Sequence, residues 1–212
     1  MPPHVPATPD QLVSAALILF GRNGFEATST RAIAQAAGAN ISSIAYHFGG
    51  KEGLRLACAD AVARRIEQIA RTIPAADAPL SQAEARAVLR RLMRRIVTFL
   101  TGTPAAEDAV GFLLRELAEP ESPALDRLYA EVVERRHRAL CGLWSAATGK
   151  DAGSDDVKLA VFSLVGQAAY FRLAAPIVQR RMGWNGYPPA ATRAITGRLL
   201  ANLDAILGAE DG

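Results

Sequence analysis

The chain has few of the residues from which disulfide frameworks and metal sites are built. It holds two cysteines, Cys58 and Cys141, and three histidines, at positions 4, 47 and 137. The cysteines lie far apart and in no metal-ligand spacing, which fits a reducing compartment and two buried thiols better than a disulfide. The sequence therefore predicts no disulfide, no metal ion and no cofactor.

Catalytic and membrane signatures are absent from the sequence as well. It contains no glycine-rich phosphate loop, no HExxH and no GxSxG, so nothing in it favours an enzyme. The first ten residues lack the basic and apolar regions of a signal peptide. The longest charge-free apolar stretch, Leu159 to Phe171, is too short to cross a bilayer. We therefore expect a soluble cytoplasmic protein that is not an enzyme and has no membrane partner.

Charge is nearly balanced over the chain, but it is unevenly distributed. The 212 residues have a formal net charge of +3. Residues 1–101 carry 12 basic and 7 acidic side chains, whereas residues 102–212 carry 12 and 14. The positive excess therefore lies in the first half, where an anionic partner would be expected. The length also leaves room for a second or an extended domain beyond one small bundle.

Residues 25–54 predict two short helices joined by a tight turn. The first helix runs from Ser29, which caps it, to Ala37, and Gly38 follows where a left-handed backbone favours glycine. The second helix runs from Ile41 to about residue 47. Two helices that cross near a right angle over such a turn form a helix-turn-helix, which is a DNA-binding motif.

A preceding helix is predicted from about Pro9 to Asn23, because apolar residues recur there at helical spacing. Gly21 and Gly24 end this helix, and Phe25 fills the joint that follows. The three helices form a bundle whose expected core is Leu12, Leu19, Phe20, Phe25, Ile33, Ile44 and Phe48.

Residues 10 to 54 resemble the DNA-binding domain of tetracycline-repressor-type (TetR-type) transcriptional regulators. The matching elements are the FGRNGFEATSTRAIAQAAG run, the YHF cluster and the KEGL that opens the next helix. Within that family, NISSIAYHFGGKEGL resembles the branch with a longer C-terminal effector-binding and dimerisation domain.

The resemblance implies an all-α fold of about nine helices. Residues 1–50 would form the helix-turn-helix domain, and residues 51–212 a helical ligand-binding and dimerisation domain. It further implies a repressor that binds a palindromic operator in double-stranded DNA as a homodimer through its last two helices and is released by an unknown small molecule. The alternative is a helical ligand-binding or scaffolding dimer that has abandoned DNA.

The candidate DNA contacts divide into phosphate anchors and base readers. Helix N-termini and nearby donors hold phosphates, whereas base edges are read from the second helix of the pair. That helix has no Arg, Lys or Gln, so we expect Ile41 and Ala45 to contact thymine methyls and Ser42 and Ser43 to give adaptable hydrogen bonds, with DNA shape supplying the rest. The complete predicted set is Thr28, Ser29, Thr30, Arg31, Asn40, Ile41, Ser42, Ser43, Ala45, Tyr46, His47 and Lys51. Taken singly, Ser29 and Asn40 would also be explained as helix caps, His47 as a partner at the bundle edge and Lys51 as a surface charge.

The rest of the chain reads as helices. The predicted ranges are Lys51 to Ile73, Ser81 to Leu100, Ala105 to Ala118, the Pro123 region to Thr148, Asp155 to Gln179, and Pro188 to Leu207. The second of these has an arginine row, which we interpret as a solvated face in preference to a nucleic-acid or lipid surface.

The middle helices resemble the effector-binding region of the family. Such a cavity needs apolar walls with a few polar groups. The candidates are Phe99, Phe112, Arg115, Tyr129, His137, Trp144 and Tyr170. The alternative is that the aromatic residues are ordinary core and that Arg115 and His137 are exposed. No ligand class follows from this set.

Overall fold

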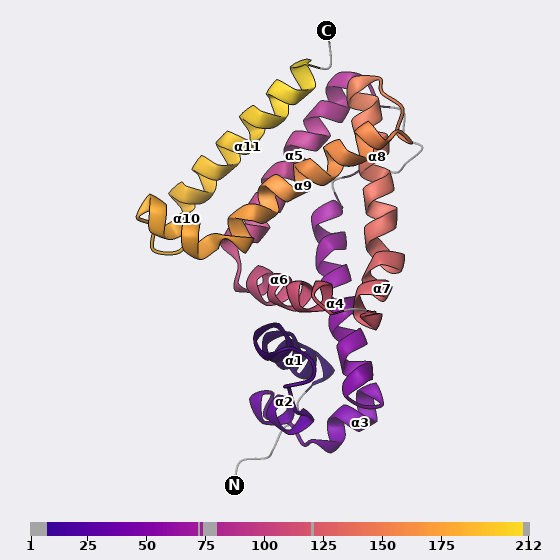
Figure 1. The fold of residues 1–212 in the computed structure, drawn as a ribbon, viewed down its shortest axis with the longest axis vertical. Coiled ribbons are helices and arrows are strands. Elements are labelled where there is room, and N and C mark those ends of the chain that lie inside the picture. The colour runs from indigo at the N-terminus through magenta and orange to yellow at the C-terminus, as the bar shows by residue number, and fades with distance from the viewer. Residues whose placement is uncertain (1–7, 72, 74–79, 120, 210–212) are drawn as a thin grey trace. The chain divides into compact units, whose positions relative to one another are not determined.

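The computed structural model describes residues 8–71, 73, 80–119 and 121–209. Within these ranges all regular elements are helical and none is a strand, which confirms the predicted all-α fold (Figure 1). Residue contacts divide the chain into two compact units, each built from separate stretches of sequence. Unit 1 takes its residues from Met1–Arg65 and Glu107–Val132, and unit 2 from Ile66–Ala106 and Val133–Gly212. The division of the chain at residue 50 into a helix-turn-helix domain and a ligand-binding and dimerisation domain stays a prediction.

The helices follow the predicted order closely. Their bounds are α1 Pro9–Asn23, α2 Thr30–Ala36, α3 Ser42–Phe48, α4 Lys51–Ala70, α5 Gln82–Gly102, α6 Pro104–Leu117, α7 Pro123–Leu128, the π-helical segment η1 Tyr129–Val133, α8 Glu134–Thr148, α9 Asp155–Leu173, α10 Ala175–Met182 and α11 Pro189–Ala209. The α7, η1 and α8 segments follow one another without a gap, as the single helix predicted there requires.

One predicted helix is wrong in its extent. The stretch from Asp155 to Gln179 is not a single helix, because α9 ends at Leu173 and α10 begins at Ala175 with a bend of 71°. Pro176 lies in the first turn of α10. A proline there has no amide hydrogen to donate and its ring clashes with the preceding turn, so a straight helix cannot continue through it.

Unit 1 is built around the predicted bundle core. Leu12, Phe20, Ile33 and Ile44 are fully buried, whereas Leu19 and Phe48 are only half-buried. In addition, α2 contacts both α1 and α3 (Figure 1). The ring of Phe20 also lies 6.5 Å from that of Phe112 on α6.

The first turns of α4 and the end of α6 are joined by a buried ion cluster. Arg55 donates from Nη2 to Glu116 at 2.6 Å and to Glu119 at 2.6 Å, and Ser122 also hydrogen-bonds to Glu116. Burial alone would lower the pKa of the Arg55 guanidinium, but the hydrogen bonds and charges of the two carboxylates raise it above its usual value. The arginine is therefore held charged inside unit 1, where the cost of desolvation is offset only while its partners remain in place.

Unit 2 is organised around α5, which contacts α8, α9 and α11. The arginine row on α5 is not simply a solvated face. Arg86 donates to the carbonyls of Ala147 and Leu207, each at 3.1 Å, which lie in the last turns of α8 and α11. In the same row Arg90 pairs with Asp204, and Arg95 donates to the carbonyl of Gln68 near the end of α4. Arginines on one helix thus hold the carboxyl ends of three others, where positive charge is favoured.

Both cysteines are free and buried, as the sequence predicts. Burial raises the pKa of each thiol. In the parts of the chain that the structure describes, no cluster of three His, Cys, Asp or Glu side chains has a metal-binding arrangement. Over the same residues no single helix is long and apolar enough to span a bilayer, and only the bent pair of α9 and α10 passes that test jointly.

The buried ion cluster predicts a large effect for Glu116→Gln. The substitution keeps the side chain's shape but leaves Arg55 short of one buried negative charge, which should lower the free energy of unfolding by about 3 kcal/mol. Urea unfolding followed by circular dichroism measures it. Glu134→Gln is the control, because its pair with Arg138 is exposed and should contribute less than about 0.5 kcal/mol. Equal, small losses in the two variants would contradict a stabilising role for the cluster.

Candidate nucleic-acid interface

The start of α2 is capped as predicted, but Thr28 does not face solvent. The Ser29 hydroxyl accepts from the amide of Ala32 at 3.1 Å. Thr28 is buried, and its hydroxyl donates to the carbonyls of Gly24 at 2.7 Å and Leu19 at 3.2 Å. This hydroxyl therefore ties the loop to α1. Of the neighbouring predicted residues, Ser29 and Arg31 are exposed and Thr30 is half-buried.

The turn between α2 and α3 has the predicted geometry. Gly38 has a φ of 64°, in the left-handed region that disfavours any residue with a Cβ. Its amide donates to Gln35, and the amide of Ala39 donates to the carbonyl of Ala34 at 2.8 Å. These two bonds form the Schellman motif, which satisfies the last carbonyls of α2 and reverses the chain.

Asn40 caps the next helix through its side chain. Its Oδ1 atom accepts from the Ser42 amide at 3.0 Å and from the Ser42 hydroxyl at 2.9 Å. The backbone of Ile41 is already helical, and α3 continues to Phe48. The side-chain cap predicted for Asn40 is thus present. The same Oδ1 atom also accepts the one hydroxyl hydrogen of Ser42.

The α3 helix buries one face and exposes the other. Ile44 is 1% exposed and Phe48 is half-buried, so both anchor the helix in unit 1. Ile41 and Tyr46, in contrast, are 50% and 84% exposed. The remaining outward residues are Ser42, Ala45 and His47, and Ser43 is half-buried. The predicted base readers therefore lie on an accessible face, together with an aromatic ring that packs edge-on against His47.

The joint between α3 and α4 is fixed by contacts that sequence reasoning missed. Gly53 in the first turn of α4 allows the Phe48 carbonyl to approach so closely that an added Cβ would lie 1.8 Å from its oxygen. The cations of Lys51 and Arg55 lie 4.2 Å and 4.4 Å from the centre of the Phe25 ring. Lys51 also donates to the Glu26 carbonyl at 3.4 Å. The lysine predicted to hold a phosphate is therefore positioned by the loop before α2.

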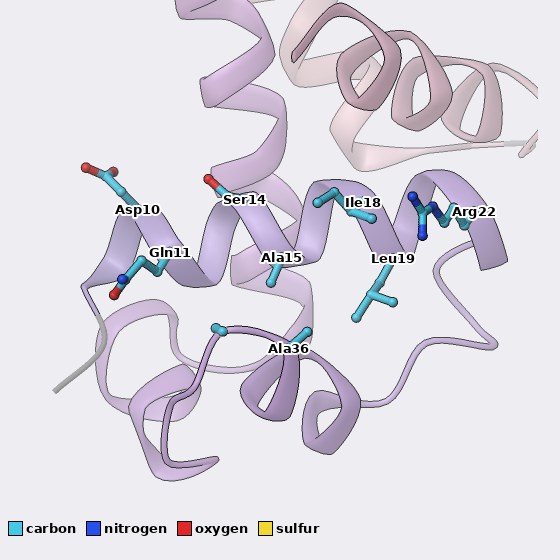
Figure 2. A pocket seen from close by; sticks show the side chains of 9 residues that line it. Asp10, Gln11, Ser14, Ala15, Ile18, Leu19, Arg22 and Ala36 are labelled. Atoms are coloured by element: carbon cyan, nitrogen blue, oxygen red, sulfur yellow. The ribbon is translucent and has the colours of Figure 1, made fainter. Parts of the chain in front are cut away.

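A shallow groove of about 550 Å³ lies beside α1 and α2 (Figure 2). Side chains of α1 line it, with Ala36 on the opposite side and Asp10 and Arg22 toward its two ends. Ala37 also lines it. No residue of the predicted DNA-contacting set lines this groove.

The seven predicted effector residues are divided between the two units. In unit 1, Phe112 is fully buried beside Phe20, and Arg115 donates to the carbonyl of Arg22 at 2.8 Å near the end of α1. In unit 2, the His137 ring stacks on Phe162 at 4.1 Å. Trp144 is buried, and its Nε1 has no hydrogen-bond partner among the described residues.

The remaining three predicted effector residues are more accessible. Tyr129 and Tyr170 are exposed, in units 1 and 2 respectively, and Phe99 of unit 2 is half-buried. The predicted set thus draws on both units, and its members Phe112 and Arg115 contact α1. The effector site stays a prediction.

A three-helix bundle with an outward α3, followed by a helical domain, is the arrangement of helix-turn-helix DNA-binding regulators. Residues 12–58 match the family model of bacterial regulatory proteins of the tetR family. Residues 85–210 match the model described as the C-terminal domain of the HTH-type transcriptional dual regulator CecR. The chain belongs to the tetR family of transcriptional regulators and has a CecR-type C-terminal domain.

Relatives and solved structures agree over nearly the whole chain. The HTH-type transcriptional dual regulator CecR of Shigella flexneri is 35% identical over 202 residues, which cover 93% of this chain and 90% of that protein. The structure of the TetR family regulator PfmR from Thermus thermophilus has a TM-score of 0.66 at 19% identity, with 96% and 97% of the two chains covered. AibR in complex with isovaleryl coenzyme A and operator DNA has a TM-score of 0.65 at 18% identity, covering 91% and 95%. These relatives are transcriptional regulators and not enzymes.

The α3–α4 joint predicts that Gly53→Ala disturbs the interface. Because the new methyl group would overlap the Phe48 carbonyl, the end of α3 must shift, and we expect a loss of about 2 to 3 kcal/mol in stability together with weaker DNA binding. Thermal unfolding and a DNA mobility shift measure the two effects. Gly142→Ala on α8 is the control, since nothing lies within 4 Å of its added Cβ and better helix propensity should stabilise it by about 0.5 to 1 kcal/mol. Unchanged stability and binding in Gly53→Ala would contradict this account of the joint.

Proposed function

We propose that this regulator is a ligand-responsive repressor, which binds a palindromic operator as a homodimer and is released by a small molecule. The observation that carries the proposal is α3, which buries Ile44 in the bundle and exposes Ile41 and Tyr46. Membership of the tetR family supports it. Family membership favours the repressor over a scaffold that has abandoned DNA. The absence of Arg and Lys from α3 does not remove the candidate anchoring residues Arg31 and Lys51, which lie outside that helix.

Phosphate anchoring in this proposal falls to residues that flank α3 in sequence and to two residues of α3 itself. Thr30 and Arg31 open α2, Lys51 opens α4, and Tyr46 and His47 are exposed on α3 itself. Arg31 and Lys51 supply the two cations of the set, so each subunit would neutralise few phosphates. Phosphate contacts set register and affinity, whereas the sequence is read elsewhere. The two α3 helices of a dimer would then enter successive major-groove segments spaced by about 34 Å or a multiple of it.

Lys51→Ala tests the anchoring. Loss of one phosphate contact should reduce the slope of log binding constant against log salt concentration by about 0.9 per subunit. Titration of the DNA upstream of the protein's own coding sequence, at several salt concentrations, measures the slope. Lys51→Arg should keep the slope, and Lys150→Ala, which removes a lysine of unit 2 that pairs with Asp156, should leave it unchanged.

Two results of this titration would argue against the anchoring proposal. Wild-type protein that fails to bind the upstream DNA at low salt would favour a dimer that has lost DNA binding. Binding that is retained with an unaltered slope in Lys51→Ala would show instead that this lysine is not an anchor.

The homodimer is supported by the apolar surface of α9. One face of this helix buries Val157, Val161 and Leu164 in unit 2, yet large apolar residues are also exposed along it. They are Leu159, Phe162, Val165, Tyr170 and Leu173. A helix that is apolar on both faces normally has a second partner.

The last helix offers the complementary surface. On α11 the exposed residues include a stripe of small ones, which are Ala194, Gly197, Ala201, Ala205 and Gly208. Small residues permit close approach of another helix. We propose that α9 and α11 form a four-helix interface with a second copy across a two-fold axis, in which the same patch serves both subunits.

Leu159→Glu tests the dimer. Leu159 is 66% exposed within one chain, so the substitution should leave the subunit folded while placing a charge in the interface. We expect sedimentation at micromolar concentration to change from dimer to monomer, and operator affinity to fall with it. Leu117→Glu on α6 is the control, because Leu117 is also exposed and lies outside the two helices. A wild-type monomer, or a dimeric Leu159→Glu variant, would refute this interface.

We place the effector contact in unit 2, at the buried Trp144. Its indole N–H is buried without a partner among the described residues, and an acceptor on a ligand would satisfy it. Ligand binding that changed the spacing of the two α3 helices would lower operator affinity, typically by about 1 to 3 kcal/mol. A screen of small molecules for release of bound DNA tests the proposal. A ligand that releases DNA equally well from a Trp144→Phe variant would argue against contact with this side chain.

A further inference from the structure

We infer that α3 reads its operator mainly through the C5-methyl groups of thymine, with Ile41 as the principal contact. The inference rests on the proposed operator binding and adds the chemistry by which bases are distinguished. It follows from which polar groups of α3 are already occupied and which apolar groups are exposed. Each of the four base pairs presents its own pattern of donors, acceptors and methyl groups in the major groove. Where α3 lacks a side chain that can bind one pattern, it must recognise the bases through the remaining patterns.

Guanine has no strong reader on this helix. The commonest specific contact to guanine is a bidentate hydrogen bond from Arg or Lys to O6 and N7, and α3 contains neither residue. The Ser42 hydroxyl has a single hydrogen, which it donates to Asn40 at 2.9 Å. Ser42 therefore offers the groove only its acceptor capacity.

The usual bidentate contact of Asn with adenine is also not available on this helix. Asn reads adenine by accepting from N6 with its side-chain oxygen while donating to N7 with its amide nitrogen. In this protein the Asn40 Oδ1 atom already accepts two hydrogen bonds, from the amide and the hydroxyl of Ser42. A carbonyl oxygen has two lone pairs, so the acceptor half of the adenine contact is taken. The Asn40 side chain is therefore a cap that shapes the start of α3, with only its N–H₂ group left for DNA.

The exposed apolar groups match the methyl group that marks thymine. Ile41 is half exposed at the start of α3, and Ala45 is exposed four residues later, on the same flank of the helix. Both are exposed, whereas Ile44, which lies between them in sequence, is buried. Contact between the methyl groups of Ile41 and a thymine methyl group removes apolar surface of both the protein and the DNA from water. This burial favours binding. Adding the methyl group of one thymine to such a contact should raise affinity on the order of four-fold.

Replacement of thymine by uracil tests the inference, since uracil lacks only the C5-methyl group. Duplexes that bind the full-length protein are first selected from a random DNA pool, and the strongest is remade with deoxyuridine at every thymine of one half-site or of both. Wild-type protein should bind the duplex with one substituted half-site at least about four-fold more weakly, and the duplex with both substituted at least about fifteen-fold more weakly. These values correspond to one methyl contact in each half-site. 5-Bromouracil, which replaces the methyl group by a bromine of similar volume, should restore binding.

A double comparison with Ile41→Ala assigns the effect to the side chain. Because Ile41 is exposed, the variant should keep the melting temperature of the wild type. It should bind the thymine duplex more weakly, yet lose little further affinity on the uracil duplex. Leu117→Ala, another exposed aliphatic residue of unit 1, should retain the full thymine-to-uracil difference.

The outcomes separate the inference from the proposed function. If no duplex is selected, both are overturned. If a duplex is selected and the wild type binds its uracil form equally well, operator binding stands and methyl reading is overturned. Methyl reading by Ile41 is also overturned if Ile41→Ala keeps the full thymine-to-uracil difference.

Discussion

The orientation of the reading helix depends on the contacts that Phe25 makes at the start of α4. Its ring lies 5.4 Å from that of Phe20 at the end of α1, and the cations of Lys51 and Arg55 lie over it. A cation over an aromatic face is held by the ring's quadrupole, and more strongly where water is excluded. One aromatic side chain therefore joins the end of α1 to the first two turns of α4. Since only Gly49 and Gly50 separate α3 from α4, fixing α4 also fixes the end of α3.

The same arginine extends this anchoring to residues much later in the chain. Arg55 is both a partner of Phe25 and the centre of the ion cluster with Glu116, Glu119 and Ser122. Arg115 adds hydrogen bonds to the last carbonyls of α1. The end of α6 is thus part of the DNA-binding unit, although it lies far beyond the start of α4 in sequence. Helix α6 begins in unit 2 and ends in unit 1, whereas α4 begins in unit 1 and ends in unit 2.

Affinity and sequence reading are assigned to different residues in this interface. The cations Arg31 and Lys51 lie at the starts of α2 and α4, whereas α3 has no Arg, Lys, Asp or Glu and presents apolar groups and hydroxyls. Phosphate contacts alone give binding without discrimination. A neutral α3 can therefore discriminate only through shape, methyl contacts and a few adaptable hydrogen bonds. The Asn40 cap reduces the available hydrogen bonds further. Its Oδ1 atom and the Ser42 hydroxyl hydrogen are bonded to each other at the start of α3 and are not available to bases.

Local patterns in the sequence were sufficient for the helices, the Gly38 turn and most of the bundle core. These features depend on residues within one or two turns of each other, such as the Ser29 and Asn40 caps and the apolar spacing around Ile33 and Ile44. Of the predicted base readers on α3, Ile41, Ser42 and Ala45 are exposed and Ser43 is half-buried, and their contacts with DNA stay predictions. Pro176 is visible in the sequence as a helix breaker. The long apolar stretch around it nevertheless led to the wrong prediction of one continuous helix from Asp155 to Gln179.

Only the tertiary structure decided which distant groups meet. The burial of Thr28, the engagement of Arg115 by α1 and the grouping of Phe112 with Phe20 all depend on contacts between segments far apart in the chain. The sequence does not distinguish whether a charged residue such as Arg55 is solvated or is buried among carboxylates. Its role follows from the partners that folding brings within hydrogen-bonding distance, and periodicity along one helix carries no information about them. The sequence by itself thus determined the elements and the class of protein, whereas long-range packing determined what each polar side chain is free to bind.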